Sequence, residues 1–204
     1  MRHALVRRKD GKHQIGGDVP QDFVIPDNEF IGGFQYVGFI DNSDPFFSWL
    51  PFRVHLIHPT YTDERFVYLD YSNPNSPTII EPQDTASSTS AFDELDKNSK
   101  IIFEGVNVSV ADIEEVRAHE YLGTCDEAEW LQEAESPSCP KSGKPMRFLC
   151  QLESFRGVEA TFSNVEPTRG MADYFQNLNF WCDGSLYVFI EPATKTMYYT
   201  IQNT

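Results

Sequence analysis

Cysteine, histidine and carboxylate side chains are the groups in this sequence that could carry chemistry. A cysteine activated by a nearby histidine is a common nucleophile, so Cys139 or Cys182 could act with His58 or His119 if the fold brought them together. The spacing of these residues along the chain gives such a pair no support. The patterns of serine hydrolases (GxSxG), zinc proteases (HExxH), dithiol sites (CxxC) and nucleotide-binding loops are absent from the sequence. We therefore expect a protein that is not an enzyme and that uses no cofactor.

The histidines and cysteines do not predict a metal site either. His55 and His58 are three residues apart, and in an extended strand this spacing points the two side chains to opposite faces. The cysteines are scattered rather than placed at the spacings of a disulfide framework: Cys125, Cys139, Cys150 and Cys182. Because no apolar leader precedes them, we expect a reduced, cytoplasmic compartment. The sequence has no run of about 18 apolar residues, so no membrane partner is expected.

The carboxylates carry the strongest signal. The formal net charge is -15 at pH 7, and residues 81–135 hold 15 acidic residues against three basic ones. Such a field repels a nucleic-acid backbone and speeds encounter with a basic protein. A glycosidase-like acid pair cannot be distinguished from a solvated surface in this background. We predict that a basic protein partner contacts the following acids: Asp93, Glu94, Asp96, Asp112, Glu114, Glu115, Asp126, Glu127, Glu129, Glu133 and Glu135.

Two other interpretations of the sequence stay open. The acids could serve only to keep the protein soluble and monomeric. The chain could also be a small-ligand or peptide-binding module, with a cleft between two halves lined by Phe46, Trp49, Trp130 or Trp181. The cluster of Phe46, Phe47 and Trp49 is, however, more typical of core or edge cover than of a ligand cage. Salt dependence separates these hypotheses, because steering by charge weakens as ionic strength rises and binding in an apolar cleft does not.

Strands are the elements that must position these residues. The chain has 204 residues, of which 40% are hydrophobic and 14% aromatic, so it can bury a proper core and is rich in strand-forming types. Alternating or continuous runs of hydrophobic residues predict strands at 34–40, 52–57, 65–70, 78–80, 146–152 and 185–190. A final hairpin is predicted to join 186–190 to 197–201. A helix is predicted from Val110 to about His119, a short helix or loop at 171–178, and a flexible insertion at 82–99.

The order of these features repeats along the chain. In each half a turn region leads into an alternating strand, and a hydrophobic strand ending near an acid follows, Arg65–Asp70 in the first and Ser185–Glu191 in the second. We predict one domain, 1–204, made of two related halves at about 13–80 and 119–204 that are joined by an acidic, partly flexible segment. The expected fold is mainly β (α+β), with internally duplicated antiparallel sheets and a few short helices.

The segment from Pro137 to Pro145, punctuated by proline and glycine, carries a resemblance to a known family. It contains Cys139-Pro140-Lys141-Ser142-Gly143-Lys144-Pro145, which Met146-Arg147-Phe148 and Gln151-Leu152 follow, and Asp183-Gly184 precedes the closing strand. This combination is similar to the YwqG-like family of bacterial proteins of unknown function. The resemblance implies a mostly β, internally duplicated fold and no established reaction. Some members resemble immunity proteins encoded beside secreted toxins, such as those delivered by type VI secretion systems.

The resemblance also bears on metal binding and on function. Many relatives have a second cysteine in this segment, and the resulting Cys-x-x-Cys is half of a four-ligand zinc site. Here the second position is Ser142, so no structural zinc is expected. The function that the sequence and the resemblance predict together is a non-enzymatic immunity protein. It would bind and neutralise a cognate bacterial toxin, for instance a secreted nuclease-type effector, through its acidic surface.

Overall fold

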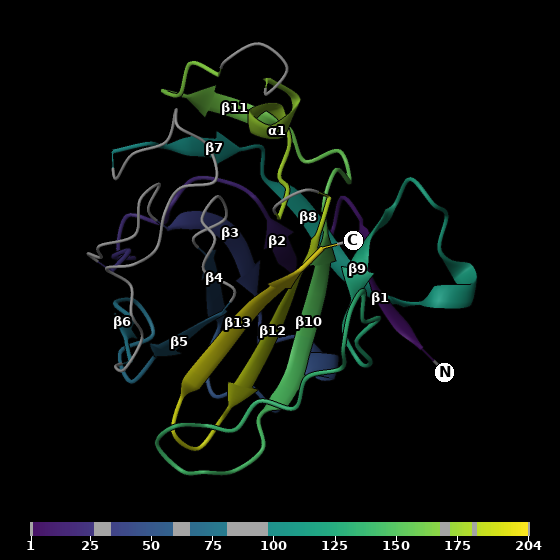
Figure 1. Ribbon diagram of the computed structural model, residues 1–204. Coiled ribbons are helices and arrows are strands. Elements are labelled where there is room, and N and C mark those ends of the chain that lie inside the picture. Colours follow the sequence, from purple (N-terminus) through teal and green to yellow (C-terminus); the bar gives the residue numbers. More distant parts are fainter. Residues whose placement is uncertain are drawn as a thin grey trace.

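The protein was analysed as a computed structural model, which describes residues 2–26, 34–58, 66–80, 98–167, 172–180 and 183–203. It is mostly β, with 43% strand and 7% helix, which confirms the predicted fold class. One large antiparallel sheet and one small two-stranded sheet contain all the named strands (Figure 1). The fold class does not test the predicted division into two related halves, which stays a prediction.

The strands of the large sheet are, in chain order, β1 (His3–Arg7), β2 (His13–Ile15), β3 (Gln35–Ile40), β4 (Val54–His58), β5 (Phe66–Asp70), β6 (Thr78–Ile79), β8 (Val106–Asp112), β9 (Tyr121–Thr124), β10 (Arg147–Glu153), β12 (Ser185–Glu191) and β13 (Thr196–Gln202). Their spatial order is β4-β3-β2-β8-β1-β9-β10-β12-β13-β5-β6. The small sheet pairs β7 (Ile101–Phe103) with β11 (Ala160–Ser163), beside the short helix α1 (Ala172–Gln176). Single 3-10 turns lie at η1 (Pro45–Phe47) and η3 (Ile113–Glu115).

The middle of the large sheet is buried on both faces. Every residue of β12 and β13 is buried, and the two strands form the predicted hairpin, with Leu186 opposite Ile201 and Ile190 opposite Met197. One face joins the main core, and the other is covered by the 126–146 segment, whose Cys139 packs in a second cluster with residues of the hairpin. Burial on both faces explains why β12 is hydrophobic from Leu186 to Ile190 rather than alternating.

The large sheet coils so that strands near its two ends approach each other (Figure 1). The buried Tyr71, just after β5, donates its hydroxyl hydrogen bond to the carbonyl oxygen of His55 in β4 at 2.6 Å. Its oxygen also lies 3.1 Å from the hydroxyl of Tyr199 in β13. These contacts satisfy polar groups that would otherwise be costly to bury, and they place the loop after β5 against β4.

The predicted helix from Val110 to His119 is wrong. Residues up to Asp112 belong to β8, which pairs along β1 with Asp112 opposite His3, and only the 3-10 turn Ile113–Glu115 follows. Asp112 caps this turn, because its side chain accepts a hydrogen bond from the backbone N–H of Glu114 at 3.1 Å. Long-range strand pairing with β1 overrode the local helical pattern.

The other local predictions fall into three groups. The strands predicted around 34–40, 52–57, 65–70, 78–80, 146–152 and 185–190 correspond to β3, β4, β5, β6, β10 and β12. The short helix expected within 171–178 is α1. The insertion predicted at 82–99 lies almost entirely outside the described residues. Among the helices that the structure describes, none is long and apolar enough to cross a membrane.

Candidate functional site

The structure brings two acidic runs of the sequence together at the start of β1. On one side β8 pairs with β1, and the backbone N–H of Ile113 donates to the carbonyl oxygen of Arg2 at 2.9 Å. On the other side β9 pairs with β1, and the N–H of Cys125 donates to the carbonyl oxygen of His3 at 3.2 Å. The 112–115 turn and the 126–129 segment therefore flank the same strand end. We call these six acids, Asp112, Glu114, Glu115, Asp126, Glu127 and Glu129, the acidic margin.

One half of the acidic margin is paired with the N-terminal strand. The guanidinium of Arg2 pairs with Glu129 and lies 3.8 Å from the carboxylate of Glu127. The hydrogen bond and charge of Glu129 raise the pKa of Arg2. One carboxylate oxygen of Asp126 accepts a hydrogen bond from the backbone N–H of His3 at 2.9 Å. The same oxygen lies 2.8 Å from the Nδ1 atom of the His3 ring. These acids hold the beginning of β1 in place.

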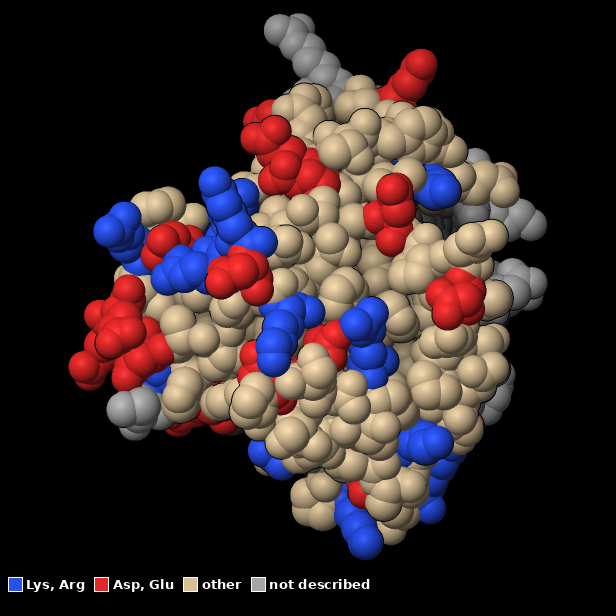
Figure 2. All heavy atoms as spheres, turned by 180° about the vertical axis from the view of Figure 1, so that it is seen from behind, with Lys and Arg blue, Asp and Glu red and all other residues tan. Residues whose placement is uncertain are grey.

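The other half of the acidic margin has no such partner. Glu114 and Glu115 are exposed, and no lysine or arginine among the described residues forms an ion pair with them or with Asp112. Seen from behind, a group of acidic side chains lies at the left margin of the molecule, the side on which the amino terminus lies, with basic side chains directly above it (Figure 2). This half supplies negative charge that is available to a partner.

The remaining predicted acids do not join the acidic margin. Glu135 accepts hydrogen bonds from the hydroxyl of Tyr198 at 2.6 Å and from the amide of Gln202 at 3.1 Å. The same amide donates to the carbonyl oxygen of Glu133 at 2.8 Å. These hydrogen bonds hold the 133–135 segment against β13. Glu135 therefore has a structural role, which its acidic side chain alone does not predict. Asp93, Glu94 and Asp96 lie outside the described residues.

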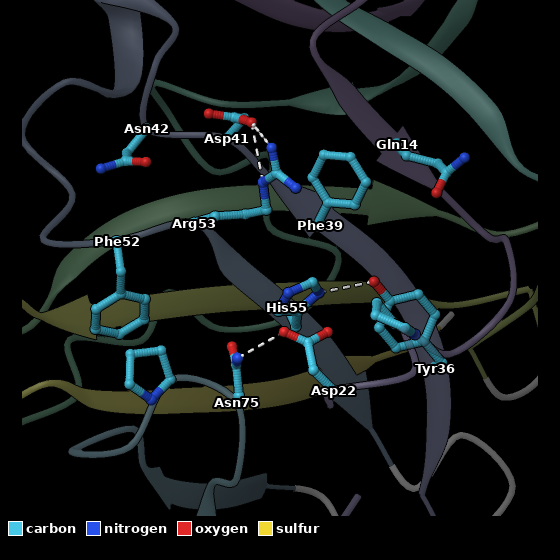
Figure 3. Close-up of a pocket in the computed structure, with 12 residues that line it drawn as sticks. Gln14, Asp22, Tyr36, Phe39, Asp41, Asn42, Phe52, Arg53, His55 and Asn75 are labelled. Atoms are coloured by element: carbon cyan, nitrogen blue, oxygen red, sulfur yellow. Dashed lines mark hydrogen bonds and ion pairs between the residues drawn. The ribbon is translucent and has the colours of Figure 1, made fainter. Parts of the chain in front are cut away.

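A pocket of about 460 Å³ lies beside β3 and β4 on a different part of the molecule (Figure 3). It is formed by strand residues together with the loops at 16–26, 41–53 and 71–77. Its lining residues are Gln14, Pro20, Asp22, Tyr36, Phe39, Asp41, Asn42, Phe52, Arg53, His55, Pro74 and Asn75. The coiling of the sheet creates this pocket, because the 71–77 loop follows β5 at the opposite end of the strand order from β4.

An arginine and an aspartate form one side of the pocket. The Nε atom of Arg53 donates to Asp41 at 2.9 Å, and the guanidinium lies over the ring of Phe39 at 4.7 Å from its centroid. Burial opposes ionisation of Asp41, but hydrogen bonds from Ser43 and from Arg53 outweigh it and lower the pKa of this carboxyl. The Arg53 side chain remains 52% exposed, so its charge faces the pocket and solvent.

A buried histidine occupies the centre of the pocket. His55 is 8% exposed, and its Nδ1 atom lies 2.8 Å from the hydroxyl of Tyr36. Burial, and next the charge of Arg53, lower the pKa of His55, so the ring is neutral at pH 7. Burial also raises the pKa of Tyr36. No group among the described residues hydrogen-bonds to the Nε2 atom of His55.

The opposite rim of the pocket joins two distant loops. Asp22 accepts a hydrogen bond from the side-chain amide of Asn75 at 2.9 Å. The backbone N–H of Val24 donates to the carbonyl oxygen of Asn75 at 2.8 Å. Phe52 stacks against Tyr71 and adds an apolar wall. A carboxylate on one rim thus faces a guanidinium on the other, with His55 between them (Figure 3).

The aromatic residues predicted to line a cleft lie elsewhere. The ring of Trp49 lies 3.7 Å below the guanidinium carbon of Arg147, and Trp130 stacks on Tyr187 at 4.6 Å. Phe46 packs against His3. None of these three predicted residues lines the pocket beside β3 and β4, and Trp181 is outside the described part of the chain.

Among the described residues, no histidine contacts Cys139, one of the two candidate nucleophiles. Cys139 is buried, and its sulfur lies 3.2 Å from the hydroxyl of Thr194. Burial opposes thiolate formation, but hydrogen bonds from Thr194, Ser142 and Thr196 lower the pKa of this thiol to about 7. His58 lies in β4 beside Tyr199, and Cys182 is outside the described residues. In the described part of the chain, no group of three or more histidine, cysteine or acidic residues could hold a metal ion.

The comparisons with known proteins give no relative. No family model matches the chain, and no curated protein or solved structure matches it. The resemblance to the YwqG-like family therefore stays a prediction.

Proposed function

We propose that the protein is a non-enzymatic immunity protein that binds and neutralises a basic bacterial toxin through the acidic margin. The observation that carries this proposal is the convergence of two separate acidic runs, 112–115 and 126–129, at the start of β1. The class of partner, a secreted toxin such as a nuclease-type effector, comes from the resemblance to the YwqG-like family. Cytoplasmic location of the complex belongs to the same proposal.

The two halves of the acidic margin have different parts in this proposal. Asp126, Glu127 and Glu129 already contact Arg2 and His3 at the start of β1. Glu114 and Glu115 have no basic partner in the described chain, so they attract one from outside. Concentrated like charge speeds the encounter with a basic surface and adds specificity more than it adds affinity. A nuclease cleft blocked by such a surface could no longer admit its substrate.

The test begins with identification of the partner. The protein is co-expressed with the product of the adjacent gene, and a pull-down from the native host is run at low and moderate salt. We expect one stoichiometric basic partner, whose toxicity is relieved by co-expression. Recovery of the protein alone at both salt concentrations, with no toxic neighbour, would contradict the proposal.

The acidic margin itself is tested by charge reversal. Glu114→Lys with Glu115→Lys should slow association with that partner roughly tenfold or more at low salt, with a smaller effect at high salt. The matched control is Glu159→Lys with Glu166→Lys, which reverses two exposed acids outside the margin. Asp112 is left unchanged because it caps the 3-10 turn. Equal association rates for both double variants would remove the acidic margin from the mechanism.

A further inference from the structure

The pocket beside β3 and β4 has a distribution of charge that suits one chemical class of ligand. Among the described residues that line the pocket, Arg53 is the only lysine or arginine, and Asp22 and Asp41 are the only acids. Asp41 is occupied by Arg53, whereas Asp22 lies on the other rim (Figure 3). The lining therefore offers a positive group at one end and a negative group at the other, across a neutral centre.

Neighbouring residues fix the orientation of the Arg53 guanidinium, which suits it to bind an anion. Its Nε and Nη2 atoms are fixed by Asp41, and the ring of Phe39 supports the guanidinium plane. The Nη1 atom has no hydrogen-bond partner among the described residues, and the side chain is 52% exposed. Guanidinium groups bind carboxylates through several N–H donors of fixed geometry. The side chain of Arg53 is thus already ordered in the free protein, so binding a ligand there costs less side-chain entropy.

Asp22 provides the complementary end. One of its oxygens accepts the amide hydrogen of Asn75, which fixes the carboxylate, and no basic residue of the described chain pairs with it. An ammonium group carries three donors and no acceptor, so a fixed carboxylate is a suitable partner.

His55 and Phe52 define the space between the two ends. His55 is more than nine-tenths buried, and one ring nitrogen is taken by Tyr36 while the Nε2 atom lacks a partner in the described chain. The neutral ring adds a hydrogen-bonding atom without adding charge. Phe52, stacked on Tyr71, offers an apolar wall for a side chain.

We propose that this pocket binds a zwitterionic α-amino acid or dipeptide, with its carboxylate on Arg53 and its ammonium group on Asp22. A volume of about 460 Å³ is of the size of small-ligand sites and accommodates either ligand. A pure anion such as phosphate would meet two carboxylates, and a pure cation on Asp22 would leave the Nη1 donor of Arg53 without an acceptor. A ligand with both charges satisfies both rims. This site is separate from the acidic margin and independent of the toxin.

The first experiment measures binding of defined probes to the full chain. Free amino acids and a panel of dipeptides are screened by thermal shift and by isothermal titration calorimetry. Each binder is compared with its N-acetyl and carboxamide derivatives, each of which lacks one charge. We expect binding by a subset of the parent zwitterions and a loss of roughly tenfold or more for either derivative. Binding of dipeptides but not of free amino acids, or the reverse, identifies which form the site takes.

The second experiment locates the site. Asp22→Asn should weaken binding roughly tenfold or more, whereas Asp18→Asn, the same change at an exposed residue of the same loop that does not line the pocket, should have no effect. The Glu114→Lys and Glu115→Lys variant should bind the ligand as the parent does, which separates this proposal from the toxin proposal. Circular dichroism checks that each variant is folded. The proposal is overturned if no zwitterion binds, if the N-acetyl derivative binds equally well, or if the two aspartate variants behave alike.

Discussion

At the scale of single residues, His13 shows how burial decides a protonation state. Its ring is fully buried in β2, and its Nδ1 atom accepts a hydrogen bond from the backbone N–H of Asp41 at 3.0 Å. An accepting Nδ1 carries no proton. The Nε2 atom lies 3.4 Å from a carboxylate oxygen of Asp44, an arrangement that favours the charged ring. Burial outweighs this carboxylate, so the pKa of His13 is lowered and the ring is neutral at pH 7.

This protonation state predicts a dependence of stability on pH. The pKa of His13 in the folded protein lies below its ordinary value of 6.5, so the unfolded chain binds more protons and stability falls as the pH drops below 6.5. In His13→Asn the amide oxygen can accept the same N–H but does not titrate. We expect its melting temperature to fall less than that of the parent between about pH 7 and about pH 5, a range in which histidines titrate.

The control for this measurement is His119→Asn, which replaces an exposed histidine. Its melting temperature should follow that of the parent across the same pH range. If His13→Asn and His119→Asn have the same pH dependence as the parent, the buried ring is not the group that links stability to pH.

At the scale of elements, the bulge in β3 shapes the pocket wall. The pairing of β3 with β4 shifts register between Tyr36 and Gly38, and Gly38 has a φ of +134°. A Cβ atom placed there would lie 2.1 Å from the carbonyl oxygen of Gln14 in β2. Only glycine therefore allows β2 and β3 to approach closely while β3 bends. This bend lies between Tyr36 and Phe39, two residues that line the pocket.

Alanine substitutions at two glycines test this interpretation. Gly38→Ala combines an unfavourable φ with a backbone collision, and we expect a loss of more than about 2 kcal/mol in the free energy of unfolding. Gly143 also has a positive φ, +68°, but a Cβ atom there meets nothing within 4 Å. Gly143→Ala should therefore cost only about 1 kcal/mol, the backbone strain alone. Chemical denaturation measures both, and equal losses would show that the close approach of β2 to β3 contributes nothing.

At the scale of the whole molecule, charge is concentrated rather than balanced. The net charge is -15, and the fold collects several acids around one strand end. Ion pairs with Arg2 offset part of this charge, and the unpaired acids of the 112–115 turn add repulsion. Like charges at the surface destabilise the compact state, and at about 0.1 M salt their repulsion is largely screened at separations beyond about 10 Å.

This repulsion predicts that salt stabilises the isolated protein. Raising NaCl from about 0.01 M to about 0.5 M should raise the melting temperature, because screening lowers the repulsion more than it weakens the exposed ion pairs. The Glu114→Lys and Glu115→Lys variant should show a smaller rise than the Glu159→Lys and Glu166→Lys control. A melting temperature that is constant or falls with salt would show that repulsion among the acids of the acidic margin does not lower the stability of the protein.

The sequence alone determined the fold class and most strands of the fold. Alternation and the content of β-branched and aromatic residues predict the strands, and the hairpin of β12 and β13 follows from two hydrophobic runs joined by a short turn. These signals are local, and therefore a single sequence carries them. The prediction failed at Val110 to His119, where β8 pairs with β1, a strand about a hundred positions away in the sequence, and this pairing outweighed the local helical pattern.

The tertiary structure decided the sites. The sequence identified the acids, but only the pairing of β1 with both β8 and β9 brought Asp112 and Asp126 to one strand end and showed that Glu135 is bound to β13. The pocket had no sequence signal, because Asp22, Arg53 and Asn75 come from separate loops. They meet because the large sheet coils and Tyr71 joins strands near its two ends. Contacts of this kind depend on the packing of the whole core, which no local pattern encodes.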